Sequence, residues 1–162
     1  MIVDRDFGHW FVGLIDGEGC FRIHKERGGS YYACHFQIKL RADDLPVLKM
    51  IERKLGFGSI KFDTTRNGNS QPAAIFIIQN RAECTQLAEV LDKFPLRAKK
   101  AKEYQIWRRA LVWWINSKRG NRWEGHRDWS GMILYYEQMK EVRQYKPPAN
   151  TRGLRGGDAK IT

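Results

Sequence analysis

Two acidic residues alternate with glycines near the start of the chain, in the segment Asp16-Gly17-Glu18-Gly19. Carboxylate oxygens are the ligands that hard divalent cations such as Mg²⁺ take in proteins. Glycine makes a helix costly to continue, so we expect a helix that arrives here to end near Gly17 to Gly19. The helix dipole disfavours carboxylates at such an end, and a bound cation would stabilise them. These residues alone leave open a second interpretation, in which both acids are simply solvated.

A helix with a glycine line is predicted just before these acids. Asp6 can cap its start, and its apolar residues recur at helical spacing, as Phe7, Trp10, Phe11 and Leu14. Gly13 and Gly17 lie four residues apart on another line of the same helix. Small residues at this spacing let two helix backbones approach closely. The pattern therefore favours a second helix packed against this one.

The rest of the chain predicts an α+β fold that positions this helix. Strands are expected over Cys20 to Glu26, Tyr31 to Arg41, Gly58 to Thr64 and Ala73 to Gln79, and further helices over about 43–55, 80–91, 99–115 and 129–145. The two strand pairs can form one four-stranded antiparallel sheet with helices packed on its apolar face. We expect residues 1–146 to be one domain and residues 147–162, rich in Gly and Arg, to be a disordered basic tail.

The other face of this sheet carries polar side chains suited to reading DNA. A two-stranded antiparallel ribbon fits the major groove, where arginine pairs with guanine and glutamine with adenine. An ordinary solvated strand face is the alternative for any one of these residues. The predicted contacts on the strands are Arg22, His24, Glu26, Tyr31, His35, Gln37, Lys39, Arg41 and Lys61, and those on a loop are Arg66 and Asn67.

Composition agrees with a polyanionic partner. The 162 residues carry a formal net charge of +11, which favours nucleic acid. A membrane surface is the competing polyanion, but the chain has no apolar run of spanning length and no signal-peptide pattern at its start. Three cysteines, an odd and sparse set without zinc-ligand spacing, favour a reducing compartment. We expect an intracellular protein, in a bacterial cytoplasm or organelle matrix, that is neither secreted nor membrane-bound.

The segment from Phe11 to Gly19 resembles the LAGLIDADG motif of homing endonucleases. The matching residues are Gly13, Leu14, Ile15, Asp16 and Gly19, with Glu18 in place of the second acid. The resemblance implies the αββαββα-type fold of that family, and it assigns catalysis and metal binding to Glu18, with the Gly17 carbonyl as a further metal ligand. The implied cofactor is Mg²⁺ or Mn²⁺, with no small-molecule cofactor.

A second resemblance places a lysine near the same site. The segment Phe94-Pro95-Leu96-Arg97-Ala98-Lys99-Lys100 is similar to the one that carries the family's active-site lysine. We map that lysine to Lys99, with Lys100 as the alternative. Its implied role is to stabilise charge or to organise water near the scissile phosphate.

The sequence holds one copy of the motif, which supplies one such acid per chain, so we expect a homodimer. The predicted interface is Trp10, Gly13, Asp16 and Gly17. The implied function is a homing endonuclease that makes a double-strand break at a long, near-palindromic target, as in intron homing. Two alternatives stay open: a catalytically inactive DNA-binding module or RNA-binding intron maturase of the same fold, and a basic structural protein.

Overall fold

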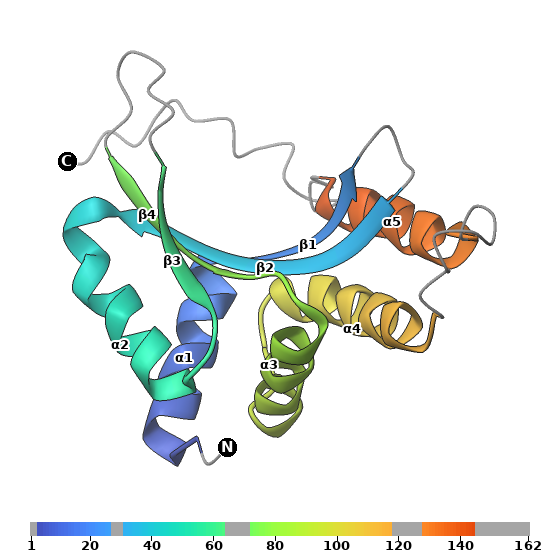
Figure 1. The fold of residues 1–162 in the computed structure, drawn as a ribbon. Helices are drawn as coiled ribbons and strands as arrows, with labels where there is room; N and C mark the ends of the chain where they lie inside the picture. Colours follow the sequence, from blue (N-terminus) through green and yellow to red (C-terminus); the bar gives the residue numbers. More distant parts are fainter. Residues whose placement is uncertain (1–2, 27–30, 64–71, 118–127, 145–162) are drawn as a thin grey trace, which may run out of the picture.

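The computed structural model describes residues 3–26, 31–63, 72–117 and 128–144. Figure 1 shows a curved sheet with four of the helices beneath it and the last one beside its right-hand end. The elements follow the order α1 (Arg5–Glu18), β1 (Gly19–Glu26), β2 (Tyr31–Arg41), the 3₁₀ turn η2 (Ala42–Asp44), α2 (Leu45–Leu55), β3 (Ser59–Asp63), β4 (Ala73–Ile78), α3 (Arg81–Lys93), α4 (Lys100–Asn116) and α5 (Ser130–Arg143). The α+β fold expected from the sequence is confirmed.

The four strands form one antiparallel sheet in the order β1-β2-β4-β3. Alternate residues along β1 and β2 are buried, because side chains of successive strand residues point to opposite faces. Phe21, Phe36 and Phe76 are among the fully buried side chains, and Trp107 of α4 lies in the same core. The helices therefore cover the apolar face, and no helix of the described residues covers the polar face (Figure 1).

Helix α1 packs on the sheet with one side. Phe7, Phe11 and Ile15 are buried and recur at helical spacing. The predicted cap was wrong: Asp4, and not Asp6, caps the helix, and its carboxylate accepts a hydrogen bond from the Phe7 amide at 2.9 Å. Asp4 lies two residues before Asp6, and the helix begins one residue before the predicted cap, at Arg5.

The other boundaries lie within a few residues of the predicted ones. Asn80 caps α3, because its side-chain oxygen accepts a hydrogen bond from the Glu83 amide. Gly56 ends α2 with a φ of 73°, a conformation that glycine adopts without strain. Arg66, Asn67 and the proposed tail 147–162 lie outside the described residues. In the part of the chain that is described, no helix has the length and apolar character needed to cross a membrane.

Helix α5 is attached to α4 and β1 by one buried charge. Glu103 of α4 is 3% exposed, the one buried charged residue of the described ranges. Arg143 of α5 donates to Glu103 at 2.9 Å and also to the backbone carbonyl of Phe21. A buried carboxylate requires such partners, because desolvation without them is costly. This link joins the end of α5 to β1, and the buried Met132 and Met139 pack the same helix into the core.

Candidate functional site

The C-terminal end of α1 carries the residues predicted to do chemistry. Glu18 is the last residue of the helix and is exposed, and β1 begins at the next residue, Gly19. The Gly19 amide donates to the Ile15 carbonyl. A Cβ at Gly19 would lie 2.6 Å from the Ile15 side chain and 2.7 Å from its carbonyl oxygen. Only glycine therefore lets the chain turn from helix to strand directly behind Glu18.

Asp16 has a different environment from Glu18. One carboxylate oxygen of Asp16 accepts from the Arg97 amide at 3.0 Å, and the other accepts from the Ala98 amide at 3.2 Å. From the sequence we expected a cation to stabilise both acids at this helix end. The Asp16 carboxylate is instead stabilised by hydrogen bonds from two backbone amides of its own chain.

The same contact brings the predicted lysine segment to α1. Lys99 directly follows Ala98, immediately precedes α4 and is exposed. Lys100 is half-buried and forms an ion pair with Glu103 at 3.3 Å. The surroundings therefore favour Lys99 over Lys100 as the lysine that is available to a substrate.

The open face of the sheet aligns the predicted polar residues in rows. Arg22 of β1 lies opposite His35 of β2, and its guanidinium donates to Gln37 at 3.4 Å. Lys39 of β2 forms an ion pair with Asp63 of β3 at 2.7 Å. These contacts hold long side chains in place on the face, so less rotamer entropy remains to be lost when a partner binds.

Two histidines stack on this face. The rings of His24 and His35 lie 4.9 Å apart with an interplanar angle of 16°. Burial, and then the charges of His24 and Arg22, lower the pKa of His35 from 6.5 to about 4. His35 is therefore neutral at physiological pH and offers hydrogen bonds rather than charge.

The comparisons with known proteins agree with this geometry. The family model described as LAGLIDADG endonuclease matches residues 11–111, which include the second half of α1 and the whole sheet. The chain belongs to the LAGLIDADG endonuclease family. The motif resemblance of Phe11 to Gly19 is thereby confirmed as a family relationship.

The chain is similar both to a curated protein sequence and to solved structures. The chain is 28% identical over 109 residues to a probable intron-encoded endonuclease of Schizosaccharomyces pombe, covering 65% of this chain and 27% of that protein. It is 29% identical to the LAGLIDADG meganuclease I-AabMI bound to uncleaved DNA, with a TM-score of 0.58, covering 67% of this chain and 37% of that one. The chain thus spans about a quarter to a third of these relatives' length.

A third relative has a similar size. The archaeal intron-encoded homing endonuclease I-Vdi141I, complexed with DNA, superposes with a TM-score of 0.68 and covers 90% of each chain, at 18% identity. At this identity the likeness establishes the fold.

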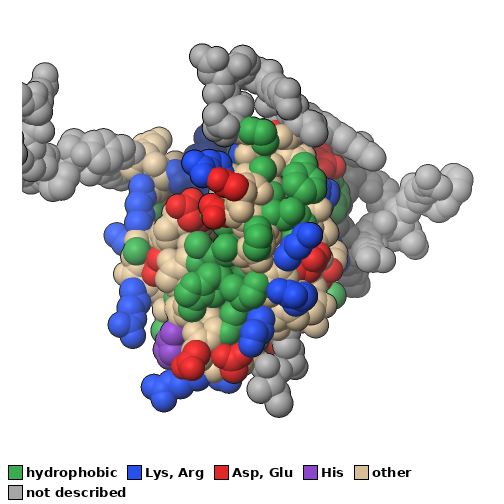
Figure 2. Space-filling view, turned by 90° about the vertical axis from the view of Figure 1, so that its left-hand side faces the viewer, with side chains coloured by type: hydrophobic (Ala, Val, Ile, Leu, Met, Phe, Trp, Pro, Cys, Tyr) green, Lys and Arg blue, Asp and Glu red, His purple; other side chains and the backbone are tan. Residues whose placement is uncertain are grey.

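The side of α1 that faces away from the sheet is open in this LAGLIDADG chain. Trp10 is 42% exposed, and a Cβ added at Gly13 or Gly17 would meet no atom of the described residues within 4 Å. Figure 2, which views the side of the molecule where α1 and α2 lie in Figure 1, shows apolar side chains gathered in the middle of the face with charged ones around them. Trp10, Gly13 and Gly17 recur at helical spacing, so they form one stripe.

The donor atoms at the end of α1 fit a divalent cation. Glu18 supplies an exposed carboxylate, and the last carbonyls of a helix, Gly17 among them, have no partner within the helix. Oxygen donors of this kind suit Mg²⁺ and Mn²⁺. The described residues contain no group of three or more His, Cys, Asp or Glu side chains placed to hold a metal.

Several residues of the open sheet face were missed by sequence reasoning. Ile75 and Ile77 of β4 lie opposite Lys39 and Gln37 of β2 and are only half-buried. Their alternation with the buried Phe76 and Ile78 along β4 could have placed them on the polar face. Asp63 could not be found in this way, because its pairing with Lys39 depends on the strand order.

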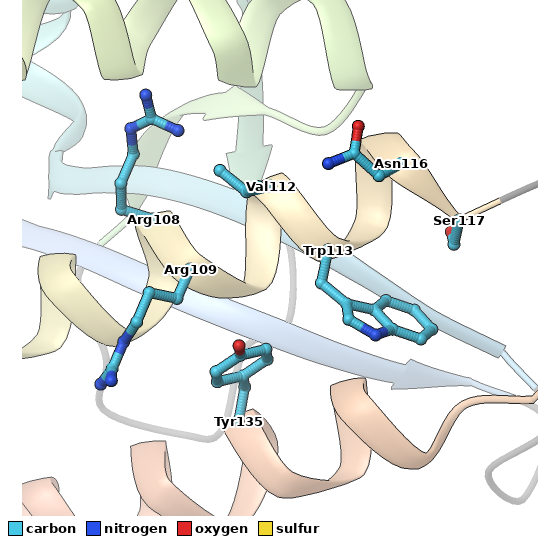
Figure 3. A pocket seen from close by; sticks show the side chains of 7 residues that line it. All are labelled: Arg108, Arg109, Val112, Trp113, Asn116, Ser117 and Tyr135. Atoms are coloured by element: carbon cyan, nitrogen blue, oxygen red, sulfur yellow. The ribbon is translucent and has the colours of Figure 1, made fainter.

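A surface pocket lies apart from both regions. It has a volume of about 710 Å³ and is lined by residues of α4, the residue after it and α5, among them Arg109, Trp113 and Tyr135. Figure 3 shows Trp113 and Tyr135 on facing helices beside this hollow. No strand residue and no residue of α1 lines it. It is therefore separate from the acid and lysine at the end of α1.

Proposed function

We propose that this chain is one half of a homodimeric, metal-dependent homing endonuclease that makes a double-strand break at a long, near-palindromic DNA site. The observation that carries the proposal is Glu18, exposed at the end of a complete family motif helix whose outer side is open. Family membership supports the reaction class, and the relatives include a probable intron-encoded endonuclease and a meganuclease bound to uncleaved DNA.

The open sheet face is the proposed DNA-binding surface. Its cations Arg22, Lys39 and Lys61 are exposed beside the half-buried amide of Gln37. Arginine and glutamine read base edges in the major groove, and lysines add contacts to phosphates or bases. The net charge of +11 supplies the long-range attraction to the polyanion. The remaining proposed contacts are His24, Glu26, Tyr31, His35, Arg41, Arg66 and Asn67.

The open side of α1 is the proposed dimer interface. In a twofold pair each Gly13 and Gly17 meets its equivalent, and the absence of a Cβ lets the backbones approach. Trp10 contributes apolar area at the edge. Asp16, also predicted at this interface, has both carboxylate oxygens engaged within its own chain. Its role between chains stays a prediction.

Pairing two chains along α1 brings two copies of Glu18 together. Glu18 and the Gly17 carbonyl would hold Mg²⁺ or Mn²⁺, which supplies an activated water and neutralises charge on the phosphate. Lys99 would place its ammonium at the charge that develops on the scissile phosphate. Neither role needs a small-molecule cofactor.

Selection from a randomised double-stranded DNA library in the presence of MgCl₂ tests the proposal. We expect sequencing of cut molecules to return one near-palindromic site, cut on both strands, with no cutting in EDTA. Selection of a bound but uncut site would favour an inactive DNA-binding module. Binding of structured RNA in preference to every DNA would favour a maturase, and both outcomes would overturn the proposal.

A further inference from the structure

We propose that Asp16 is a positioning residue, which holds Lys99 beside the end of α1 for the reaction proposed above. The effect of Asp16 on cutting rests on the proposed endonuclease function, because Lys99 is proposed to act in that reaction. The contact itself is a property of the folded chain and can be measured without any reaction. Asp16 would then act through Lys99, without touching the DNA or a metal ion.

The first step is the direction in which the two acids of the motif point. Residues two apart on a helix do not face each other. Glu18 is exposed, whereas Asp16 is half-buried and its two oxygens accept from the successive amides of Arg97 and Ala98. The two acids thus lie on different sides of the helix end, and Asp16 faces its own chain.

The second step is the electrostatics of the contact. The carboxylate of Asp16 lies at the C-terminal end of α1, where the helix dipole opposes it, and just before the first turn of α4, where the dipole favours it. Hydrogen bonds from amides to an ionised carboxylate are stronger than bonds between neutral groups. The contact therefore fixes the start of α4 to the end of α1.

The third step is a second anchor at the other end of the same segment. The ring of Phe94 is 5% exposed and packs directly over Gly8 of α1, where a Cβ would lie 2.5 Å from two ring carbons. His9 contacts the edge of this ring, with centroids 5.2 Å apart. Residues 94–98 thus run along α1, and both ends of this short segment are fixed to the helix.

The fourth step concerns the residues on either side of Lys99. Ala98 is held by Asp16, and Lys100 is held by its ion pair with the buried Glu103. Lys99 lies between two fixed neighbours, and its own side chain is exposed. Preorganised groups contribute most to transition-state stabilisation, and a displacement of about 1 Å can cost on the order of 100-fold in rate.

The test is Asp16→Asn, with Asp6→Asn as a matched control. Asn keeps one acceptor oxygen but places an NH₂ group against the other amide, so one hydrogen bond is lost. Asp6 is an exposed acid on the same helix, and no hydrogen bond of its side chain is recorded among the described residues. We expect Asp16→Asn to speed amide hydrogen exchange of Arg97 or Ala98 by at least about 10-fold, and Asp6→Asn to leave both unchanged. If Arg97 and Ala98 exchanged their amide hydrogens at the wild-type rate in Asp16→Asn, the proposed anchoring of this segment by Asp16 would be wrong.

A double-mutant cycle with Lys99→Ala tests whether Asp16 acts through Lys99. At saturating DNA and Mg²⁺, we expect Asp16→Asn to slow cutting by roughly 10- to 100-fold with DNA affinity unchanged. In the Lys99→Ala background the same change should slow cutting by less than about 3-fold. An equal loss in both backgrounds would overturn the positioning role. If the wild-type protein cut no DNA, the proposed function would fail, while the exchange measurement would still decide the contact.

Discussion

The two sides of α1 differ in what they contact. The inner side packs Phe11 and Ile15 into the core, fits Gly8 under Phe94 and binds two backbone amides through Asp16. The outer side presents Trp10, Gly13, Gly17 and Glu18, and a Cβ at either glycine would meet no described atom within 4 Å.

Glycines and acids of α1 that look alike in the sequence therefore have different surroundings in the structure. Gly8 and Asp16 have partners in their own chain and serve the fold. A Cβ at Gly13 would meet no described atom and Glu18 is exposed, and the roles proposed for these two residues involve a second chain and a cation. Substitutions on the two sides should therefore affect different measurements.

The largest effect is expected at the outer acid. Glu18→Gln should slow DNA cutting by more than about 100-fold, because Gln preserves the size but removes the anion that would hold the metal. DNA affinity, measured by fluorescence anisotropy, should stay within a few-fold of wild type. Glu89→Gln, an equal change at an exposed position of α3, should leave both unchanged. Wild-type cutting by Glu18→Gln in Mg²⁺ would remove Glu18 from the metal site.

The second effect is expected at the outer glycines. Gly13→Leu should abolish dimerisation, because its side chain blocks the approach of two helix backbones, as judged by sedimentation velocity. The open surroundings of Gly13 allow the single chain to accept the larger side chain, so circular dichroism should show an intact fold. A Gly13→Leu protein that still dimerises would place the interface elsewhere.

An inner glycine should instead change stability. Gly8→Ala should lower the free energy of unfolding by about 1–3 kcal/mol, because its Cβ overlaps the Phe94 ring. Phe94→Leu makes room, so the double variant should be more stable than the sum of the two single losses. Urea denaturation of all three variants measures this coupling, and strict additivity would contradict the close packing.

The smallest effect is expected on the polar face of the sheet, where His35 should make the stability of the fold depend on pH. Burial lowers the pKa of His35 from 6.5 to about 4, so the folded state favours the neutral ring. The resulting stability is present above pH 6.5 and is lost as the pH falls towards 4. Between pH 7 and pH 4.5, wild type should lose about 1–2 kcal/mol more than His35→Gln. An NMR titration of His35 with a midpoint near 6.5 would refute the assignment.

The sequence predicted the elements well because their signals are local. The strand predicted over Tyr31 to Arg41 and the helix predicted over about 80–91 depend on neighbours within a few residues, and both were confirmed. The motif likewise identified the family from one continuous segment.

Long-range partners were harder to predict. The bonds from Arg97 and Ala98 to Asp16 join residues about 80 positions apart, and the pairing of Lys39 with Asp63 requires β2 and β3 to flank β4. No spacing rule encodes such contacts. The assigned role of each site residue stays a prediction until variants are measured.

The most direct test of the central claim is the mass of the species that cuts. Light scattering combined with a cleavage assay at the same protein concentration should give twice the 19.0 kDa chain mass together with a break in both DNA strands. The account predicts that dilution into the monomer range abolishes double-strand cutting. A 19.0 kDa species that still cuts both strands would contradict it.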